Sequence, residues 1–177
     1  VNLSARLALA STWGAAWAVL VLHAPDHLNR SEVGFGLLTT SAAMGGLLST
    51  VLYDRIERRF DLGTVMRAVL LLEVLAHLAF ALTTSGTVAM LIMFVFGAYA
   101  FVWGAVSQTV RQRATPMDLQ GRVGSVYMVC VFGGIVVGQA LGGWIAETWG
   151  LTAPFWFAFV GSGLTLALVW RQLPSIA

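Results

Sequence analysis

The chain has 177 residues, of which 58% are hydrophobic and 10% are charged; this excludes a water-soluble domain, in which about a quarter of the residues are charged. The ten basic residues are all arginines near the ends of apolar segments, as in loops that face anionic lipid headgroups, so they do not indicate a nucleic-acid partner. Cys130 is the single cysteine, which excludes an internal disulfide and a cysteine-based metal centre.

Six apolar segments follow one another along the chain, each close to the ~20 residues that cross the hydrocarbon core of a bilayer. They are residues 3–22, 33–53, 62–82, 87–106, 123–146 and 153–170. Backbone amides have no water partners at that depth, so each segment must satisfy its own hydrogen bonds as a helix. The sequence therefore predicts an all-α membrane protein with six transmembrane helices in one domain over residues 1–177.

The first segment places Trp13 and Trp17 four residues apart, on one face of a helix. Beyond it, Pro25 lies between His23 and His27, and we expect the proline to interrupt the helix and leave a solvated loop over residues 23–32. No further ligands cluster near these histidines. The sequence predicts no metal site and no cofactor.

The third segment carries two ionisable residues, Glu73 and His77, one helical turn apart. Ionisable groups within a membrane are costly and are functional candidates by default. The pair predicts either a proton relay or a structural pair that satisfies itself or bonds an adjacent helix. Arg67, near the start of this segment, is expected to extend to the headgroups.

The fourth segment carries a polar and aromatic stripe at helical spacing, formed by Phe96, Tyr99, Trp103 and Ser107. In the loop after it, Thr115, Pro116 and Asp118 have the pattern of a helix start. We therefore expect a short cytoplasmic helix before the fifth segment. We likewise expect Ser31 to cap the start of the helix in the second segment.

The arginines alternate between the two sets of loops. One set of helix ends carries nine of them and the other carries Arg30 alone. Because basic residues concentrate on the cytoplasmic side, we expect a multi-pass protein of the cell (inner) membrane with both termini in the cytoplasm. The nine are Arg6, Arg55, Arg58, Arg59, Arg67, Arg111, Arg113, Arg122 and Arg171.

A family resemblance begins in the loop after the second segment. The sequence Asp-Arg-Ile-Glu-Arg-Arg over residues 54–59, following Gly45 and Gly46, resembles the loop signature of the major facilitator superfamily. In the next loop of that side, Arg113, Pro116 and the Gly-Arg-Val triplet at residues 121–123 resemble the pattern before the eleventh helix of exporter-type members.

The resemblance, carried over all 177 residues, implies the C-terminal half of a twelve-helix transporter, with two inverted three-helix repeats. The implied partners are the lipid bilayer, the missing N-terminal six-helix half, protons and a small-molecule substrate. It also implies a conformational latch in the loops, in which Asp54 pairs with arginines or a helix end. The latch residues are Asp54, Arg55, Arg58, Arg59, Arg113, Pro116, Gly121 and Arg122.

In this superfamily the first and fourth helices of each half line the central cavity, helped by the second and fifth. The resemblance therefore implies a cavity suited to a bulky, largely apolar compound. The residues expected to line it are Trp13, Trp17, Thr40, Met44, Tyr99, Trp103, Tyr127 and Gln139. For each of these residues helix packing is the alternative.

The fifth segment is rich in glycine. Its pattern is similar to the glycine signature in the fifth helix of drug and proton antiporters, and small residues four apart allow close helix approach. We expect a packing role for Gly134, Gly138, Gly142 and Gly143.

These features together predict secondary active transport by alternating access, as proton-coupled efflux of an amphipathic compound. The chain begins at Val1, close to the first segment, so we expect a fragment of a longer protein. A non-transporting scaffold, or a permease subunit of a larger complex, is the alternative. The sequence lacks a channel filter and an ATPase-coupling helix, and Gly161-Ser162-Gly163 lacks the order of a serine-protease nucleophile, so we expect no enzyme.

Overall fold

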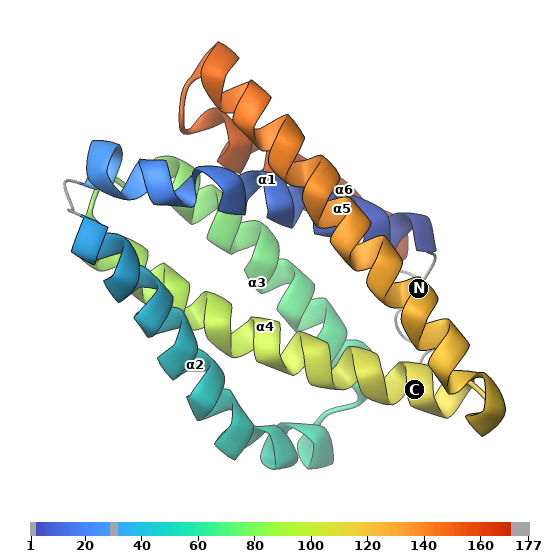
Figure 1. Cartoon of the computed structure of the whole chain (residues 1–177). Coiled ribbons are helices and arrows are strands. Elements are labelled where there is room, and N and C mark those ends of the chain that lie inside the picture. The colour runs from blue at the N-terminus through green and yellow to red at the C-terminus, as the bar shows by residue number, and fades with distance from the viewer. Residues whose placement is uncertain (1–2, 29–31, 171–177) are drawn as a thin grey trace.

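The computed structural model describes residues 3–28 and 32–170, with side chains for residues 8–20 and 34–170. In these residues it consists of six α-helices and one 3-10 turn, with no strand (Figure 1). The elements are α1 (Leu3–Leu28), α2 (Glu32–Arg59), α3 (Leu62–Leu82), α4 (Gly86–Ala114), η1 (Met117–Leu119), α5 (Gln120–Trp149) and α6 (Ala153–Val169). The all-α prediction is confirmed.

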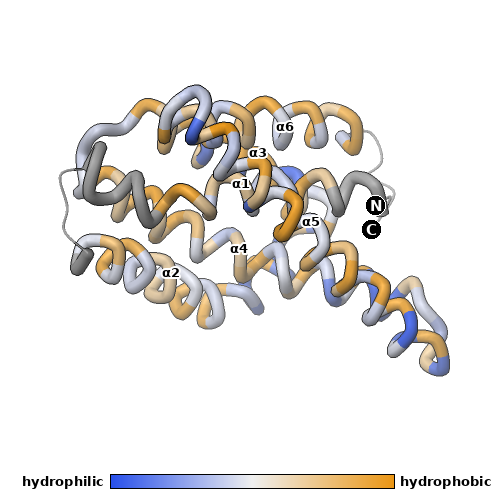
Figure 2. Tube along the Cα trace, turned by 45° about the horizontal axis from the view of Figure 1, so that its top comes forward, coloured by the Kyte–Doolittle hydropathy of each residue, from blue (hydrophilic) through white to orange (hydrophobic). Residues whose placement is uncertain are grey.

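Four of the described helices are long and apolar enough to cross a membrane: they span Gly34–Arg59, Leu62–Leu82, Gly86–Ala114 and Met117–Trp149. Shorter apolar helices cover Ala8–Leu20 and Ala153–Val169. Figure 2 shows apolar residues along most of the bundle and hydrophilic residues gathered where α4 turns into α5. Large apolar side chains are exposed on several helices, including Leu47 and Val51 of α2 and Phe132 of α5, as expected of surfaces that meet lipid or another protein.

Several helices extend beyond the predicted apolar segments. The predicted break at Pro25 is wrong, because α1 continues to Leu28; proline removes one backbone donor but does not always end a helix. Likewise α2 includes the polar residues up to Arg59, and α4 reaches Ala114. These polar turns contain no glycine or proline, so nothing ends the helix where the apolar residues end.

The short helix predicted before the fifth segment is present as the 3-10 turn η1, but the cap predicted at Thr115 is wrong. Thr115 is the C-cap of α4, and Pro116 precedes a 3-10 turn without a side-chain capping hydrogen bond. This turn leads directly into α5, so the predicted separate helix is a single turn. A side-chain cap is found instead at the start of α3, where Asp61 accepts hydrogen bonds from the amide and hydroxyl of Thr64, each at 2.7 Å. Ser31 lies outside the described residues.

The helix pairs repeat in two sets of three. Helix α1 packs against α5 and α6, and α4 packs in the same way against α2 and α3, while α3 and α6 pack against each other. Exchanging α1–α3 with α4–α6 leaves this pattern of partners unchanged. The fold is therefore two inverted three-helix repeats, as predicted.

Glycines set the closest helix approaches. A Cβ atom on Gly138 would overlap the Ser11 carbonyl of α1, and one on Gly142 would overlap the Ala15 carbonyl. The equivalent crossing of α2 and α4 is equally tight, since a Cβ on Gly45 or Gly97 would overlap the facing backbone. Any residue larger than glycine at these positions would require one of the two helices to shift.

The other two glycines predicted to pack on α5 differ in their surroundings. Gly134 is buried. Gly143 is exposed, and a Cβ there would have no heavy atom within 4 Å, so the packing role predicted for Gly143 is wrong. Only one face of α5 can contact α1, and Gly143 lies on a different face of α5.

Candidate functional site

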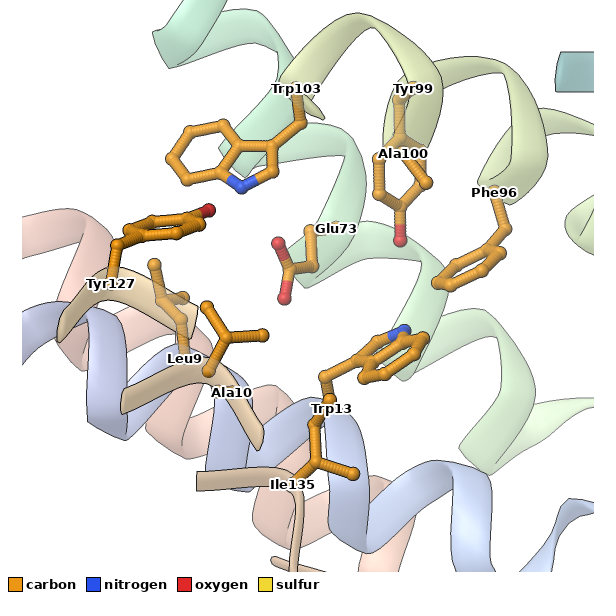
Figure 3. Close-up of a pocket in the computed structure, with 11 residues that line it drawn as sticks. Leu9, Ala10, Trp13, Glu73, Phe96, Tyr99, Ala100, Trp103, Tyr127 and Ile135 are labelled. Atoms are coloured by element: carbon orange, nitrogen blue, oxygen red, sulfur yellow. The ribbon is translucent and has the colours of Figure 1, made fainter. Parts of the chain in front are cut away.

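A cavity of about 210 Å³ lies between α1, α3, α4 and α5 (Figure 3). Its wall is almost entirely apolar and aromatic. The lining residues are Leu9, Ala10, Trp13, Glu73, Phe96, Tyr99, Ala100, Trp103, Tyr127, Val131 and Ile135. An apolar pocket with a few convergent polar groups is the usual form of a small-molecule site.

Aromatic rings form a connected group along one side of the cavity. The Trp13 ring is stacked on Trp17 at 5.5 Å and on Phe96 at 6.3 Å between centroids. Phe96 in turn meets Tyr99 edge to face at 5.2 Å. Such pairs favour defined ring positions, so residues from α1 and α4 hold one another in place.

Glu73 brings a carboxylate into this aromatic surrounding. It is 9% exposed, and Figure 3 shows its carboxylate among Trp13, Tyr99, Trp103 and Tyr127. Among the described residues that line the cavity, Glu73 is the only charged one. The third helix was not among the helices expected to line the cavity, yet the Glu73 side chain of α3 reaches between α1 and α4.

The hydroxyl of Tyr99 has no hydrogen-bond partner within the described part of the protein, although the residue is only 5% exposed. A buried hydroxyl without a partner is costly. Since Tyr99 lines the cavity, a molecule within the cavity is the available source of a partner.

At one end of the cavity, the ring of Tyr127 forms a cation–π contact with Arg111. The guanidinium carbon of Arg111 lies 3.6 Å from the ring centroid of Tyr127, and Arg111 also donates to the Ser107 hydroxyl at 3.0 Å. Sequence reasoning placed Arg111 only among the basic loop residues. Arg111 follows Ser107 by four residues on α4, and this spacing could have predicted the hydrogen bond between them.

His77 does not line this cavity. It lies against a second space of about 20 Å³, enough for one water molecule, bounded by Trp17, Phe80 and Phe155 among others. The His77 Nδ1 atom is buried and has no partner among the described residues. Trp13 and Phe96 border both spaces. Their rings therefore lie between the cavity that contains Glu73 and the smaller space beside His77.

The structure thus brings together four of the eight residues predicted to line the cavity: Trp13, Tyr99, Trp103 and Tyr127. Trp17 borders the second space instead. Thr40, Met44 and Gln139 are exposed and line neither space. The Thr40 hydroxyl donates to its own helix at the Gly36 carbonyl, at 2.8 Å.

The predicted latch residues lie at the end of the bundle where α2 leads into α3 and α4 leads into α5, which we call the arginine-rich end. The carboxylate that pairs with an arginine there is that of Glu57, 3.8 Å from Arg113. Within the described residues the Asp54 carboxylate forms no ion pair with an arginine, and the Asp54 backbone carbonyl accepts a hydrogen bond from Arg58. Arg55, Arg59, Pro116, Gly121 and Arg122 are exposed.

No group of three potential metal ligands occurs among the residues with described side chains. Side chains around His23 and His27 lie outside them.

A bundle of apolar helices in two inverted repeats, with a cavity between them, defines a multi-pass membrane transport protein. The sequence comparison agrees: the family model of the Major Facilitator Superfamily matches residues 3–176, and the chain belongs to that superfamily. No match was found among curated proteins.

Proposed function

We propose that this chain is the C-terminal six-helix half of a secondary active transporter that exports a small amphipathic molecule in exchange for protons. The cavity around Glu73 is the observation that carries the proposal. It combines an aromatic surface for an apolar compound with a carboxylate able to bind and release a proton.

The size of the cavity supports the assignment to one half of a larger protein. Its volume of about 210 Å³ is below the ~300–1,000 Å³ of a typical ligand pocket. A second six-helix half against this side of the bundle would supply an opposing wall. Exposed apolar residues of α2 and α5, among them Leu47 and Phe132, offer surface for such a half as well as for lipid.

The tight helix crossings support joint movement of α1 with α5 and of α4 with α2, and the packing of α3 on α4 and α6 and of α6 on α1 joins the two pairs. Helix α1 is joined closely to α5 at Gly138 and Gly142, and α4 is joined to α2 at Gly45 and Gly97. Helices that cannot separate without losing such contacts move together, and alternating access in inverted-repeat transporters is largely rigid-body rocking.

Glu73 and His77 are our candidates for proton coupling. Glu73 faces Tyr99 and Tyr127 across the cavity, and His77 lies one turn away on the same helix with its Nδ1 atom buried. A water in the space beside His77 would give that atom a partner. Protonation of Glu73 in one orientation of the transporter and its release in the other would couple the gradient to substrate movement.

We assign the arginine-rich end to the cytoplasm of the cell (inner) membrane, following the distribution of basic residues. In this orientation the Glu57–Arg113 pair and the neighbouring arginines act as the latch that favours one state of the transporter. The latch lies at the surface, so it affects the rate of the conformational change more than substrate affinity.

The test uses the intact transporter that contains this chain, reconstituted in proteoliposomes with an imposed pH gradient. A panel of amphipathic cations, antibiotics and siderophores is offered, and we expect at least one compound to move only while the gradient is present. Glu73→Gln should abolish that movement, and Glu147→Gln, an exposed carboxylate near the end of α5, should not. Gradient-independent movement, or none for any compound, would contradict the proposal.

A further inference from the structure

We propose that the cavity selects monovalent lipophilic cations, with Glu73 as the counter-ion and Tyr99 as a second, hydrogen-bonding determinant. This inference rests on the proposed transport function and specifies its substrate class. It starts from the chemistry of the cavity wall.

The charge of the wall favours a cation. Glu73 is the only charged residue among the described lining residues. Arg111 lies at 3.6 Å from the Tyr127 ring but does not line the cavity. An anion would therefore meet a carboxylate in an apolar surrounding, where like charges repel strongly, whereas a cation gains the opposite charge.

The rings around the carboxylate favour a cation with an apolar body. Trp13, Phe96, Trp103 and Tyr127 all contribute to the wall, and the π-electron density of such rings attracts cations, most strongly for tryptophan. A small, strongly hydrated cation would lose its water with few replacement ligands, since Glu73, Tyr99 and Tyr127 are the only described lining residues with side-chain oxygens, whereas a cation such as Ca²⁺ takes about six to eight oxygen ligands. The combination therefore fits a quaternary or tertiary onium group with aromatic or aliphatic substituents.

Tyr99 adds a polar preference. Its hydroxyl is buried, lines the cavity and has no partner within the described residues. A ligand with an acceptor oxygen close to its cationic centre would satisfy that hydroxyl while the charge faces Glu73. Such a ligand should bind better than one that offers the charge alone.

The experiment measures equilibrium binding to the purified intact transporter by isothermal titration calorimetry. The probes are methyltriphenylphosphonium, (methoxymethyl)triphenylphosphonium, which adds an acceptor oxygen, and the neutral triphenylphosphine oxide. Glu73→Gln should weaken both cations at least tenfold and change the affinity of the neutral compound by less than twofold. Glu73→Asp should retain part of the cation affinity, and Glu147→Gln should retain all of it.

Tyr99→Phe separates the second determinant. It should weaken the methoxymethyl cation at least threefold and leave the methyl cation unchanged. Retained binding of triphenylphosphine oxide shows that the Glu73 variants are folded, and unchanged binding of the methyl cation, which offers no acceptor oxygen, shows that Tyr99→Phe is folded. Three results would overturn the inference. The first is equal cation affinity in the wild type and Glu73→Gln, and the second is an equal loss of affinity for the cations and the neutral compound. The third is a wild-type protein that binds no cation.

Failure here is distinguishable from failure of the proposed function. If a neutral or anionic compound moves with the pH gradient in proteoliposomes while neither cation binds, the substrate class is wrong and the transport function stands. If no compound moves, the proposed function itself is wrong.

Discussion

The guanidinium carbon of Arg111 lies 3.6 Å from the centre of the Tyr127 ring, so a residue of α4 fixes a ring of α5 that lines the cavity. A cation–π contact of this kind contributes about 0.5–2 kcal/mol. It links the arginine-rich end of the bundle to the candidate site.

We expect Arg111→Met and Tyr127→Leu to destabilise the protein non-additively. A double-mutant cycle on thermal unfolding in detergent should give a coupling free energy of about 0.5–2 kcal/mol. Tyr127→Phe keeps the ring and should keep the coupling. Strict additivity of the two single changes would show that the contact contributes nothing.

Replacing Gly138 by alanine should destabilise the protein by about 1–3 kcal/mol, the usual cost of overpacking. The added methyl would overlap the Ser11 carbonyl on α1. The matched control is Gly143→Ala on the same helix, where the methyl meets no heavy atom within 4 Å and stability should be unchanged or slightly higher. Similar melting temperatures for the two variants would argue against the α1–α5 packing described here.

The inverted repeat makes a parallel prediction for α2 and α4. Gly45→Ala should destabilise about as much as Gly138→Ala, because its Cβ would overlap the Phe94 carbonyl. Gly46→Ala is the control, since its Cβ would lie at an ordinary contact distance of 3.6 Å from the Gly97 carbonyl. Equal melting temperatures for the two neighbouring variants would be inconsistent with this crossing.

The sequence was sufficient to predict the number of helices and their approximate positions, because only helices satisfy the backbone in lipid. It did not predict the helix ends. Membrane thickness limits the length of the apolar segment but not the length of the helix. The polar turns that end at Arg59 in α2 and at Ala114 in α4 contain no helix-breaking residue, so the helices continue through them. The continuation of α1 through Pro25 is a different case, because proline disfavours a helix interior but does not always end a helix.

The candidate site was predictable in part. The spacing of Trp13 on α1 and of Tyr99 and Trp103 on α4 gave the correct faces, and these residues do meet. Thr40, Met44 and Gln139 do not join them, because in a membrane both the packed and the lipid-facing sides of a helix are apolar, and periodicity does not fix the rotation of the helix. For the same reason the direction of the Glu73 side chain, into the cavity, was not predictable from the sequence.

Acid should remove the stabilising effect of the α3 cap. The hydroxyl and amide of Thr64 donate to the Asp61 carboxylate and hold the pKa of Asp61 below its ordinary value of 3.8. A carboxyl group with a lowered pKa in the folded state stabilises that state fully above the unfolded pKa, and the effect is lost as pH falls through the folded pKa. The stability difference between wild type and Asp61→Ala should therefore be constant above about pH 5 and shrink below about pH 4.

Thermal unfolding of both proteins across this pH range checks the prediction, with Asp118→Ala, a change at another exposed carboxylate, as the control. A difference between wild type and Asp61→Ala that grows on acidification would have the wrong sign.

The Glu57–Arg113 pair should affect transport rate more than stability. The atoms are 3.8 Å apart, and the side chains are 34% and 67% exposed, and exposed pairs contribute about 0–1 kcal/mol. Glu57→Arg should lower the initial rate of gradient-driven transport several-fold with little change in melting temperature. The charge exchange Glu57→Arg with Arg113→Glu should recover most of the rate, and a rate that stays low in the exchanged protein would rule out a latch between these two residues.

Substrate protection of a cysteine in the cavity tests most directly whether the space around Glu73 holds the transported molecule. In the intact transporter, with Cys130 and any other reactive cysteine replaced by serine, Ala100→Cys places a thiol in the cavity wall, and Ala114→Cys places one at the exposed end of the same helix. We predict that a transported compound slows maleimide labelling at position 100 at least fivefold and leaves labelling at position 114 unchanged. Equal labelling rates at position 100 with and without the compound would contradict the account.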